Sequence, residues 1–311
     1  MAPEAPATAE QAAFLDELLR AGLLIASGTP GVYGRGETFE DVLTRVDALI
    51  SGVAAPDGAE RLRFPPLIPR EQLERIGYLK SFPHLAGTIF SFDGDEEAAL
   101  AQEQLADRGE DWSSHQQMTD LVLVPAACYP VYPAIAGRGP MAAGGVLVDA
   151  GGSYVFRREP SGDPARMQMF HQRELVRLGE PETVAAWRDV WRDRAVALLA
   201  GLELDAQMAV ANDPFFGRSG RLLARSQRAQ ELKFEVTVPI AGDEPTAVAS
   251  FNYHQEHFTS KFDLVMADGS VAHTACLGFG LERITLALVR AHGLDPAAWP
   301  QAVRAQLWSA A

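Results

Sequence analysis

The 311-residue sequence predicts an α+β fold in which helices flank an antiparallel sheet. Several segments alternate apolar and polar residues at the period of a strand, without the regular strand–helix alternation of a parallel sheet. Amphipathic helices lie before, between and after these segments. The pair Asp268-Gly269 stands between two of them, where it predicts a hairpin turn.

The N-terminal part predicts a tail and three helices. Residues 1–10 are rich in Ala, Pro and Glu and predict a disordered tail. Apolar residues at i, i+4 spacing predict a helix over residues 10–27 and a second over residues 37–51. The proline-rich segment 63–83 predicts a short strand, a turn, and a helix that begins near Pro69.

The central and C-terminal parts supply the sheet. The predicted strands are residues 88–92, 121–133, 146–160, 168–179, 231–240 and 246–253. Residues 161–167 contain the Gly, Asp and Pro of a loop between two antiparallel strands. Amphipathic spacing predicts one helix over residues 182–202 and another within residues 278–293.

The composition is that of a soluble globular protein, with 47% hydrophobic and 22% charged residues. A net charge of -14 argues against the broad basic surface of a non-specific nucleic-acid binder. The chain has no apolar run of about 18 residues or more, and its acidic start does not resemble a secretory signal, so we expect a cytoplasmic protein without a membrane span. Cys128 and Cys276 are expected to be buried thiols or metal ligands, because a reducing compartment disfavours a disulfide.

The segment FRREP places Arg157 and Glu159 two residues apart. On a strand such residues point to the same face, so both side chains are expected to project together from the strand's end. The guanidinium fork suits an α-phosphate, the carboxylate can accept a hydrogen bond from an adenine amino group, and Phe170 can stack on the purine. The alternative is a surface ion pair.

A second segment, GFGLERITLAL, leads into a helix whose first turn presents Glu282 and Arg283. Gly278 and Gly280 allow close approach to the backbone, and a cation here can hold the β- and γ-phosphates of ATP. The alternative is an ordinary strand-to-helix turn.

Together, in this order and about 125 residues apart, the two segments resemble motifs 2 and 3 of class II aminoacyl-tRNA synthetases. The segment 63–83 lies where motif 1 falls. The runs PAACYP, ANDPFFGR, LKFEVTVPI, SFNYHQEHF and HTACLGFGLER narrow the resemblance to the amino acid:[carrier protein] ligases, relatives of the atypical seryl-tRNA synthetases of methanogens. The resemblance covers roughly residues 11–293. It implies one class II catalytic domain over residues 11–311, with a helical insertion at about 182–228.

The resemblance also implies one zinc ion per subunit, held by Cys128, Glu174 and Cys276. Each lies on or beside a predicted core strand, and two thiolates with a carboxylate are acceptable zinc ligands. Three protein ligands leave a fourth position, which the α-amino group of the substrate would fill. His171 and His273 are alternative ligands nearby.

Further residues stand where the family lines its ATP and substrate pocket. Arg157 and Arg283 are the expected catalytic cations, and Mg²⁺ is expected with ATP. The expected nucleotide contacts are Arg157, Glu159, Arg166, Met167, Phe170, Glu231 and Arg283. The expected substrate contacts are Glu174, Ser250 and Asn252, with Lys233 nearby. For Ser250 and Asn252 the alternative is hydrogen bonding within the strand.

No tRNA-binding domain is expected, because residues 1–115 show no long heptad helix and residues 284–311 are too few for an anticodon-binding domain. A docking face for an acidic carrier protein is predicted instead from seven arginines. These are Arg188, Arg192, Arg194, Arg218, Arg221, Arg225 and Arg228. The alternative is a solvated helix face.

The resemblance thus predicts ATP-dependent activation of glycine or alanine as an aminoacyl-adenylate, and transfer to the phosphopantetheine thiol of a carrier protein. It implies a homodimer that uses neither tRNA nor a membrane. The alternatives are a minimal aminoacyl-tRNA synthetase, a ligase with a free amine as acceptor, and an inactive synthetase paralogue with a regulatory role. The presence of every motif residue and candidate zinc ligand argues against the inactive paralogue.

Overall fold

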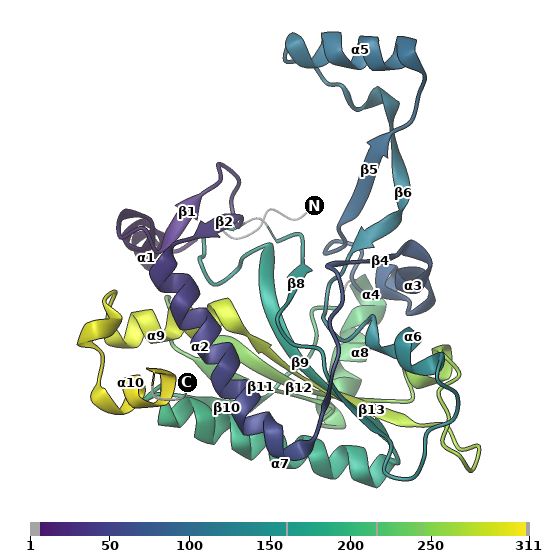
Figure 1. Cartoon of the computed structure of the whole chain (residues 1–311), viewed down its shortest axis with the longest axis vertical. Coiled ribbons are helices and arrows are strands. Elements are labelled where there is room, and N and C mark those ends of the chain that lie inside the picture. The colour runs from purple at the N-terminus through teal and green to yellow at the C-terminus, as the bar shows by residue number, and fades with distance from the viewer. Residues whose placement is uncertain (1–6, 160, 216, 243, 309–311) are drawn as a thin grey trace.

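The computed structural model describes residues 7–159, 161–215, 217–242 and 244–308. An eight-stranded sheet forms its centre, in the order β10-β11-β12-β13-β9-β7-β3, with β8 also paired to β9 (Figure 1). The pairs are antiparallel except β3 with β7. The strands are β3 (Glu60–Arg61), β7 (Val146–Asp149), β8 (Ser153–Phe156), β9 (Met169–Gly179), β10 (Gln207–Val210), β11 (Lys233–Val238), β12 (Thr246–Gln255) and β13 (His273–Gly280).

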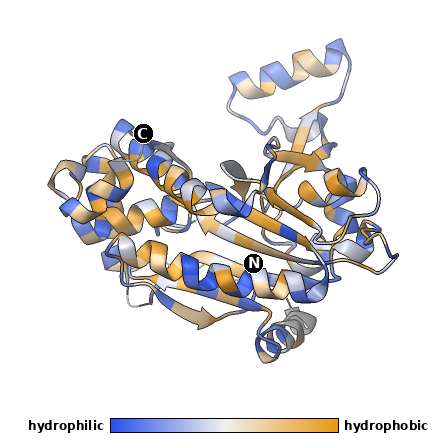
Figure 2. Ribbon diagram, turned by 60° about the horizontal axis from the view of Figure 1, so that its bottom comes forward, coloured by the Kyte–Doolittle hydropathy of each residue, from blue (hydrophilic) through white to orange (hydrophobic). Residues whose placement is uncertain are grey.

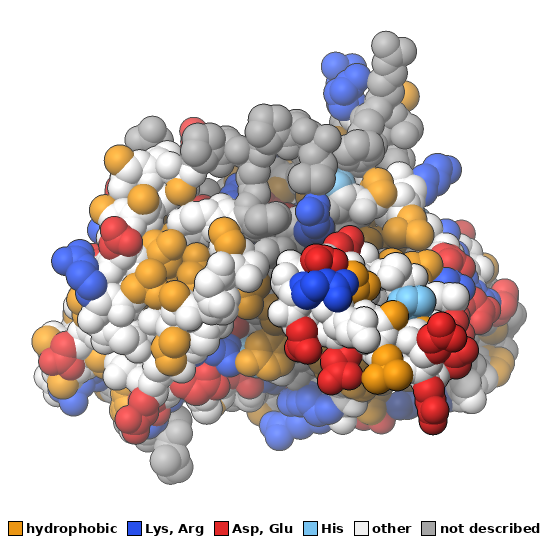
Figure 3. All heavy atoms as spheres, turned by 90° about the horizontal axis from the view of Figure 1, so that it is seen from above, with side chains coloured by type: hydrophobic (Ala, Val, Ile, Leu, Met, Phe, Trp, Pro, Cys, Tyr) orange, Lys and Arg blue, Asp and Glu red, His pale blue; other side chains and the backbone are white. Residues whose placement is uncertain are grey.

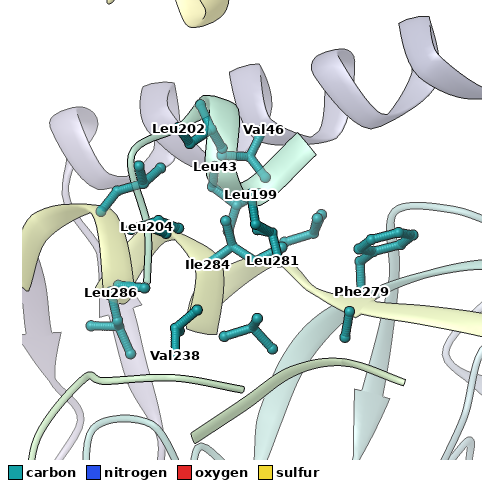
Figure 4. Packing of buried hydrophobic residues seen from close by; sticks show 14 of the residues in the cluster. Leu43, Val46, Leu199, Leu202, Leu204, Val238, Phe279, Leu281, Ile284 and Leu286 are labelled. Atoms are coloured by element: carbon teal, nitrogen blue, oxygen red, sulfur yellow. The ribbon is translucent and has the colours of Figure 1, made fainter. Parts of the chain in front are cut away.

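One face of this sheet packs on helices. The helices are α1 (Ala9–Arg20), α2 (Glu37–Ala54), α7 (Pro181–Gly201), α9 (Leu281–His292) and α10 (Gln301–Trp308). They share a hydrophobic core with strand residues such as Leu175, Phe251 and Phe279. Leucines of α2, the end of α7 and α9 meet in this core (Figure 4). Figure 2 shows hydrophobic residues along the sheet, whereas the helices contain both hydrophobic and hydrophilic residues. This mixture is expected of helices that bury one face and expose the other to solvent.

The opposite face is covered at one end by a second hydrophobic cluster. Its elements are β4 (Leu67–Pro69), α3 (Arg70–Arg75), α4 (Tyr78–Ser81), β6 (Gln116–Leu123) and α6 (Val131–Ala136). Strands β4, β6 and β5 (Thr88–Phe92) form a small sheet, from which α5 (Glu96–Asp107) projects away from the body (Figure 1). The remaining part of this sheet face is open and borders the cavity described below.

The other elements are short or peripheral. Strands β1 (Leu24–Ala26) and β2 (Tyr33–Arg35) pair with each other, and α8 (Gly217–Ala229) precedes β11. Short 3-10 helices span Ala55–Asp57, Ser113–His115, Thr259–Lys261 and Pro296–Ala298. No helix in the described part of the chain is both long and apolar enough to cross a membrane.

The N-terminal helix differs from its prediction at both ends. It begins at Ala9, because Thr8 caps it with a reciprocal hydrogen-bond pair, so part of the predicted tail is helical. It ends at Arg20, since Gly22 takes a positive φ of 67°, and the last apolar residues of the predicted helix form β1 instead. Residues 1–6 of the predicted tail lie outside the described residues.

Two predicted strands are shorter than expected. Residues 131–133 begin α6 after Pro130 instead of extending a strand. The predicted strand 146–160 divides into β7 and β8, because Gly152 turns the chain with a φ of 71°.

The prediction also overstated one hairpin and one helical segment. The hairpin around Asp268-Gly269 is reduced to an isolated bridge between Val265 and Val271. The segment 182–228 is not purely helical, because β10 within it pairs with β11 and forms the edge of the main sheet.

Candidate active site

The open face of the main sheet presents polar residues in register across four neighbouring strands. Residues directly opposite each other in an antiparallel pair point to the same face. One row runs Lys233, Asn252 and Cys276, the next runs Glu235, Ser250, Gly278 and Glu174, and a third pairs Gly280 with Gln172. The intervening residues point to the helical core on the other face, so strand alternation alone brings these side chains together.

These rows form the floor of a cavity of about 860 Å³. All but one of the predicted site residues line it. They are Cys128, Arg157, Glu159, Arg166, Met167, Phe170, Glu174, Ser250, Asn252, Cys276 and Arg283. The exception is Glu231, which is exposed and has a positive φ of 51° in the turn before β11. Glu235, inside the strand, lines the cavity instead.

Sequence analysis also missed Gln172, which lies between Phe170 and Glu174 on the same face of β9. Its Oε1 accepts from the backbone N–H of Ala127 at 3.3 Å. A Cβ at Gly278 would lie 2.8 Å from Nε2 of Gln172, so any side chain at this point of the floor would have to displace the Gln172 amide. The period-two alternation of β9 was the signal that could have found Gln172.

At one end of the cavity, three arginines converge. Arg283 donates from Nε to the carbonyl oxygen of Ala165 at 2.8 Å and from Nη1 to that of Ala247 at 2.9 Å. Burial lowers the pKa of Arg283, and the positive charges of Arg157 and Arg166 lower it further, against the pull of nearby carboxylates. Arg157 and Arg166 thus bring two further positive charges close to Arg283, and such a group of cations can form a site for a polyanion.

Arg157 and Glu159 reach the cavity from a loop. Strand β8 ends at Phe156, so the prediction that they share a strand face was wrong, although both line the cavity. Nε of Arg157 donates to the carbonyl oxygen of Pro125 at 3.1 Å, and its guanidinium lies 5.6 Å from the centre of the Phe170 ring. The arginine is therefore fixed beside an aromatic face.

The loop between β8 and β9 is held by Asp163, which the sequence analysis did not single out. Its Oδ1 accepts from the backbone N–H of Ala165 at 2.9 Å, and its Oδ2 accepts from Nε2 of Gln11 on α1 at 3.1 Å. Arg166 lies in the same loop, 56% exposed, with carboxylate contacts of 3.7 Å to Asp163 and 3.9 Å to Glu159. Its exposure leaves the Arg166 guanidinium accessible to a ligand in the cavity.

At the other end of the cavity, Cys128, Glu174 and Cys276 form a compact cluster. Their ligand atoms all lie within 4.8 Å of one another, and each residue is 2% exposed. The backbone N–H of Cys128 donates to Glu174. Nδ2 of Asn252 lies 3.7 Å and Nε2 of His254 lies 3.2 Å from the sulfur of Cys276.

The chemistry of this cluster fits a zinc ion. Burial raises the pKa of the Cys128 thiol well above its usual range, and the neighbouring Cys276 and Glu174 raise it further. Burial likewise raises the pKa of Glu174 despite its hydrogen bonds to Cys128. Three acidic groups are costly to ionise together in a dry site, and a divalent cation relieves that cost.

The two alternative histidine ligands lie outside the cluster. Nδ1 of His171 contacts Glu282 at 2.9 Å. His273 is hydrogen-bonded to Tyr253 and lies 3.6 Å from Glu256. Both rings therefore have partners away from the thiols.

Lys233 forms a buried ion network in the cavity wall. Its Nζ lies 2.6 Å from Oδ1 of Asp213 and 3.0 Å from Oε1 of Glu235. Burial lowers the pKa of Lys233, but the two carboxylates outweigh it and the pKa is raised. Asp213 also exchanges two hydrogen bonds with Gln227 of α8, at 2.7 and 2.8 Å. This network ties α8 to the cavity.

The predicted arginine docking face divides into two groups. The arginines of α7 have internal partners: Arg188 is buried and donates to the carbonyl oxygen of Glu231 at 3.0 Å, Arg192 lies 4.2 Å from the ring centre of Phe234, and Arg194 contacts Asp57 at 2.7 Å. In α8, Arg221, Arg225 and Arg228 are exposed, and the side chain of Arg218 lies outside the described part.

The molecular surface mixes both signs of charge. On the face seen in Figure 3, acidic and basic side chains of the described residues are interspersed. The described residues of this face do not form a broad basic area.

The fold is that of the catalytic domain of class II aminoacyl-tRNA synthetases. Seryl-tRNA synthetase of M. kandleri, solved in complex with A. aeolicus tRNASec, matches with a TM-score of 0.78 at 23% identity, over 98% of this chain and 62% of that chain. Seryl-tRNA synthetase from Pyrococcus horikoshii, solved with ATP, matches with a TM-score of 0.64 at 15% identity, over 90% of this chain and 58% of that chain. The chain thus spans less than two thirds of these synthetases.

Sequence relatives are more specific, although no protein-family model matches the chain. Amino acid–[acyl-carrier-protein] ligases 1 and 2 of Bradyrhizobium diazoefficiens are 44% and 47% identical, each over 97% of this chain and over 92% and 90% of their own lengths. The type-2 serine–tRNA ligase of Methanopyrus kandleri is 29% identical over 83% of this chain and 52% of its own length. The chain belongs to the amino acid–[acyl-carrier-protein] ligase family and is a ligase.

Proposed function

We propose that this chain activates a small amino acid, glycine or alanine, with ATP and transfers it to the phosphopantetheine thiol of a carrier protein. The single observation that supports this most is the layout of the cavity. The Cys–Glu–Cys cluster and Arg283, with Arg157 and Arg166 near it, line one cavity above one sheet face, where Cys276 and Gly280 stand four residues apart on β13. A polyphosphate and a metal-bound amine would thereby be held in one space, with the reacting carboxylate between them.

In the proposed activation step, a carboxylate oxygen of the amino acid attacks the α-phosphorus of ATP, and pyrophosphate leaves. Arg157 would neutralise the α-phosphate, and Arg283, anchored on two carbonyl oxygens, would hold the β- and γ-phosphates with Mg²⁺. Phe170 would stack on the purine and Glu159 would accept from its amino group. The attacking carboxylate is already ionised, so positioning and charge neutralisation supply the rate without a general base.

Cys128, Glu174 and Cys276 would hold one zinc ion. When bound, the metal supplies a coordination position for the α-amino group, which selects amino acids over other carboxylic acids. The floor between the metal ligands and the arginines, with Ser250, Asn252 and Gln172, would then orient the substrate carboxylate.

In the proposed transfer step, the sulfur of the phosphopantetheine thiol attacks the carbonyl carbon of the adenylate. The thioester forms, AMP leaves with the electrons of the broken bond, and the thiol proton passes to solvent. Arg221, Arg225 and Arg228 on α8 would face the acidic carrier, because they are exposed and α8 is hydrogen-bonded to the cavity wall through Gln227. We also propose a homodimer, as the class II resemblance implies.

The test is transfer of labelled glycine and labelled alanine, with ATP and Mg²⁺, to a phosphopantetheinylated carrier protein and, in parallel, to bulk tRNA. Label on the carrier that a thioester-cleaving reagent releases is the expected result, and it identifies the preferred amino acid. Label on tRNA would mean a minimal synthetase. Absence of pyrophosphate exchange with every amino acid would mean an inactive paralogue.

The double variant Arg221→Glu with Arg225→Glu tests the docking surface. It should reduce carrier loading, and its pyrophosphate exchange, which serves as the control, should stay intact. Both positions are exposed on α8, and neither is among the described residues that line the cavity. Loss of both activities would instead indicate damage to the fold or the cavity, whereas unchanged carrier loading would contradict the docking assignment.

A further inference from the structure

Behind the wall of the nucleotide site, on the side away from the cavity, Arg35 of β2 contacts four different elements. Its Nη1 donates to Oε1 of Glu282 at 2.7 Å, and its Nη2 donates to the hydroxyl of Tyr154 at 2.8 Å. Nη1 also lies 2.5 Å from Nδ1 of His171, and Nε contacts Oε2 of Glu40 at 2.9 Å. The partners come from α9, β8, β9 and α2.

Three of these partners, Glu282, His171 and Tyr154, lie close in sequence to residues that line the cavity beside the arginines. Glu282 directly precedes Arg283, and His171 directly follows Phe170. Tyr154 lies on the short strand β8, which leads into Arg157. His171 alternates on β9 with Phe170 and Gln172, which line the cavity, so it points to the opposite face of the strand, where Arg35 contacts it.

Glu282 is the centre of this arrangement. Its side chain is 4% exposed, and its two carboxylate oxygens accept from the backbone N–H of His171 at 2.9 and 2.8 Å. The carboxylate thereby joins the start of α9 to the start of β9. The Arg35 side chain, 12% exposed, supplies the countercharge that a buried carboxylate needs. It also extends the link to β8 through Tyr154.

We propose that Arg35 is a positioning residue for ATP, which sets the relative placement of Arg157, Phe170 and Arg283 from behind through Tyr154, His171 and Glu282. This inference rests on the proposed use of ATP. Because the planar guanidinium reaches several partners at once, lysine cannot replace it: a single ammonium on a flexible stem cannot span the same partners. The metal cluster at the other end of the cavity is outside this network.

The test compares Arg35→Lys, Tyr154→Phe and Glu40→Gln by pyrophosphate exchange and by binding of a fluorescent ATP analogue. Arg35→Lys should raise the KM for ATP roughly tenfold or more, the equivalent of one charge-assisted hydrogen bond. The KM for the amino acid and the zinc content should stay unchanged. Tyr154→Phe removes one hydroxyl contact without leaving a buried charge, and it should raise the KM for ATP by a smaller factor.

Glu40→Gln is the matched control. Glu40 is 48% exposed and links Arg35 to α2 only, so this variant should behave like the wild type. An unchanged KM for ATP in folded Arg35→Lys, or equal effects on ATP and amino acid in all three variants, would overturn the proposal. If Arg35→Lys does not fold, Tyr154→Phe decides. A wild-type protein that does not bind the ATP analogue would instead overturn the proposed function itself.

Discussion

The anchoring of Arg283 allows a quantitative prediction for the substitution Arg283→Lys. The guanidinium donates to two backbone carbonyl oxygens, of Ala165 at 2.8 Å and of Ala247 at 2.9 Å. Lysine carries one nitrogen, so it can keep at most one of these anchors while also facing a phosphate. A hydrogen bond from a charged donor contributes about 1.5–3 kcal/mol. At about 1.36 kcal/mol per factor of ten, the kcat/KM for ATP should fall roughly 10- to 150-fold.

The assay is pyrophosphate exchange at varied ATP with saturating amino acid. The positive charge is retained, so a loss reports the geometry of the cation and not its presence. Arg228→Lys, on the exposed part of α8, is the matched control and should leave the exchange unchanged. If Arg283→Lys retained the wild-type kcat/KM for ATP, the argument that anchored arginines position the phosphates would be refuted.

Three further outcomes are expected. Cys276→Ala should remove stoichiometric zinc, measured by metal analysis, together with adenylate formation; full activity in a zinc-free variant would contradict the metal site. Asp213→Asn should lower the free energy of unfolding by about 1–3 kcal/mol, because Lys233 loses one of its two carboxylates. Burial raises the pKa of Asp213, but Lys233 and the hydrogen bond from Gln227 outweigh it and the pKa is lowered. In thermal melts at several pH values, this difference should therefore be present above the ordinary aspartate pKa of about 3.9 and vanish as the pH falls through the lowered pKa. Glu235→Gln should reduce pyrophosphate exchange, whereas Glu231→Gln should not. The opposite result would support Glu231, the nucleotide contact predicted from the sequence.

The candidate site residues could be predicted from sequence motifs through the family resemblance, and strand alternation, a local property, supported part of this prediction. Glu174 on β9 and Cys276 on β13 were predicted on core strands, and they do share one sheet face. Glu231 was predicted to contact the nucleotide, but Glu235 lines the cavity in its place, so the sequence pattern alone did not select the correct glutamate. Both glutamates fit an alternating segment, but only the start of β11, set by the turn after α8, decides which of them faces the cavity.

Contacts between distant segments could not be predicted in the same way. The link from Gln11 to Asp163 and the link from Arg35 to Glu282 join residues 152 and 247 positions apart. Similarly, the arginines of α7 are indistinguishable in sequence from free surface charges, yet Arg188 and Arg194 have internal partners. A charged side chain at helical spacing predicts which face it occupies but not what lies opposite.

The sequence by itself determined the α+β class and the main strands, because periodicity is written along the chain, and its motifs carried the family resemblance that implied the ATP-binding segments and the three candidate zinc ligands. Only the tertiary structure decided that these residues line one cavity, that β10 completes the sheet edge, and that Arg35 contacts Glu282 beside Arg283. The physical reason is that register and packing are set by contacts between segments remote in sequence, and a buried charge selects its partner only when the chain has closed around it.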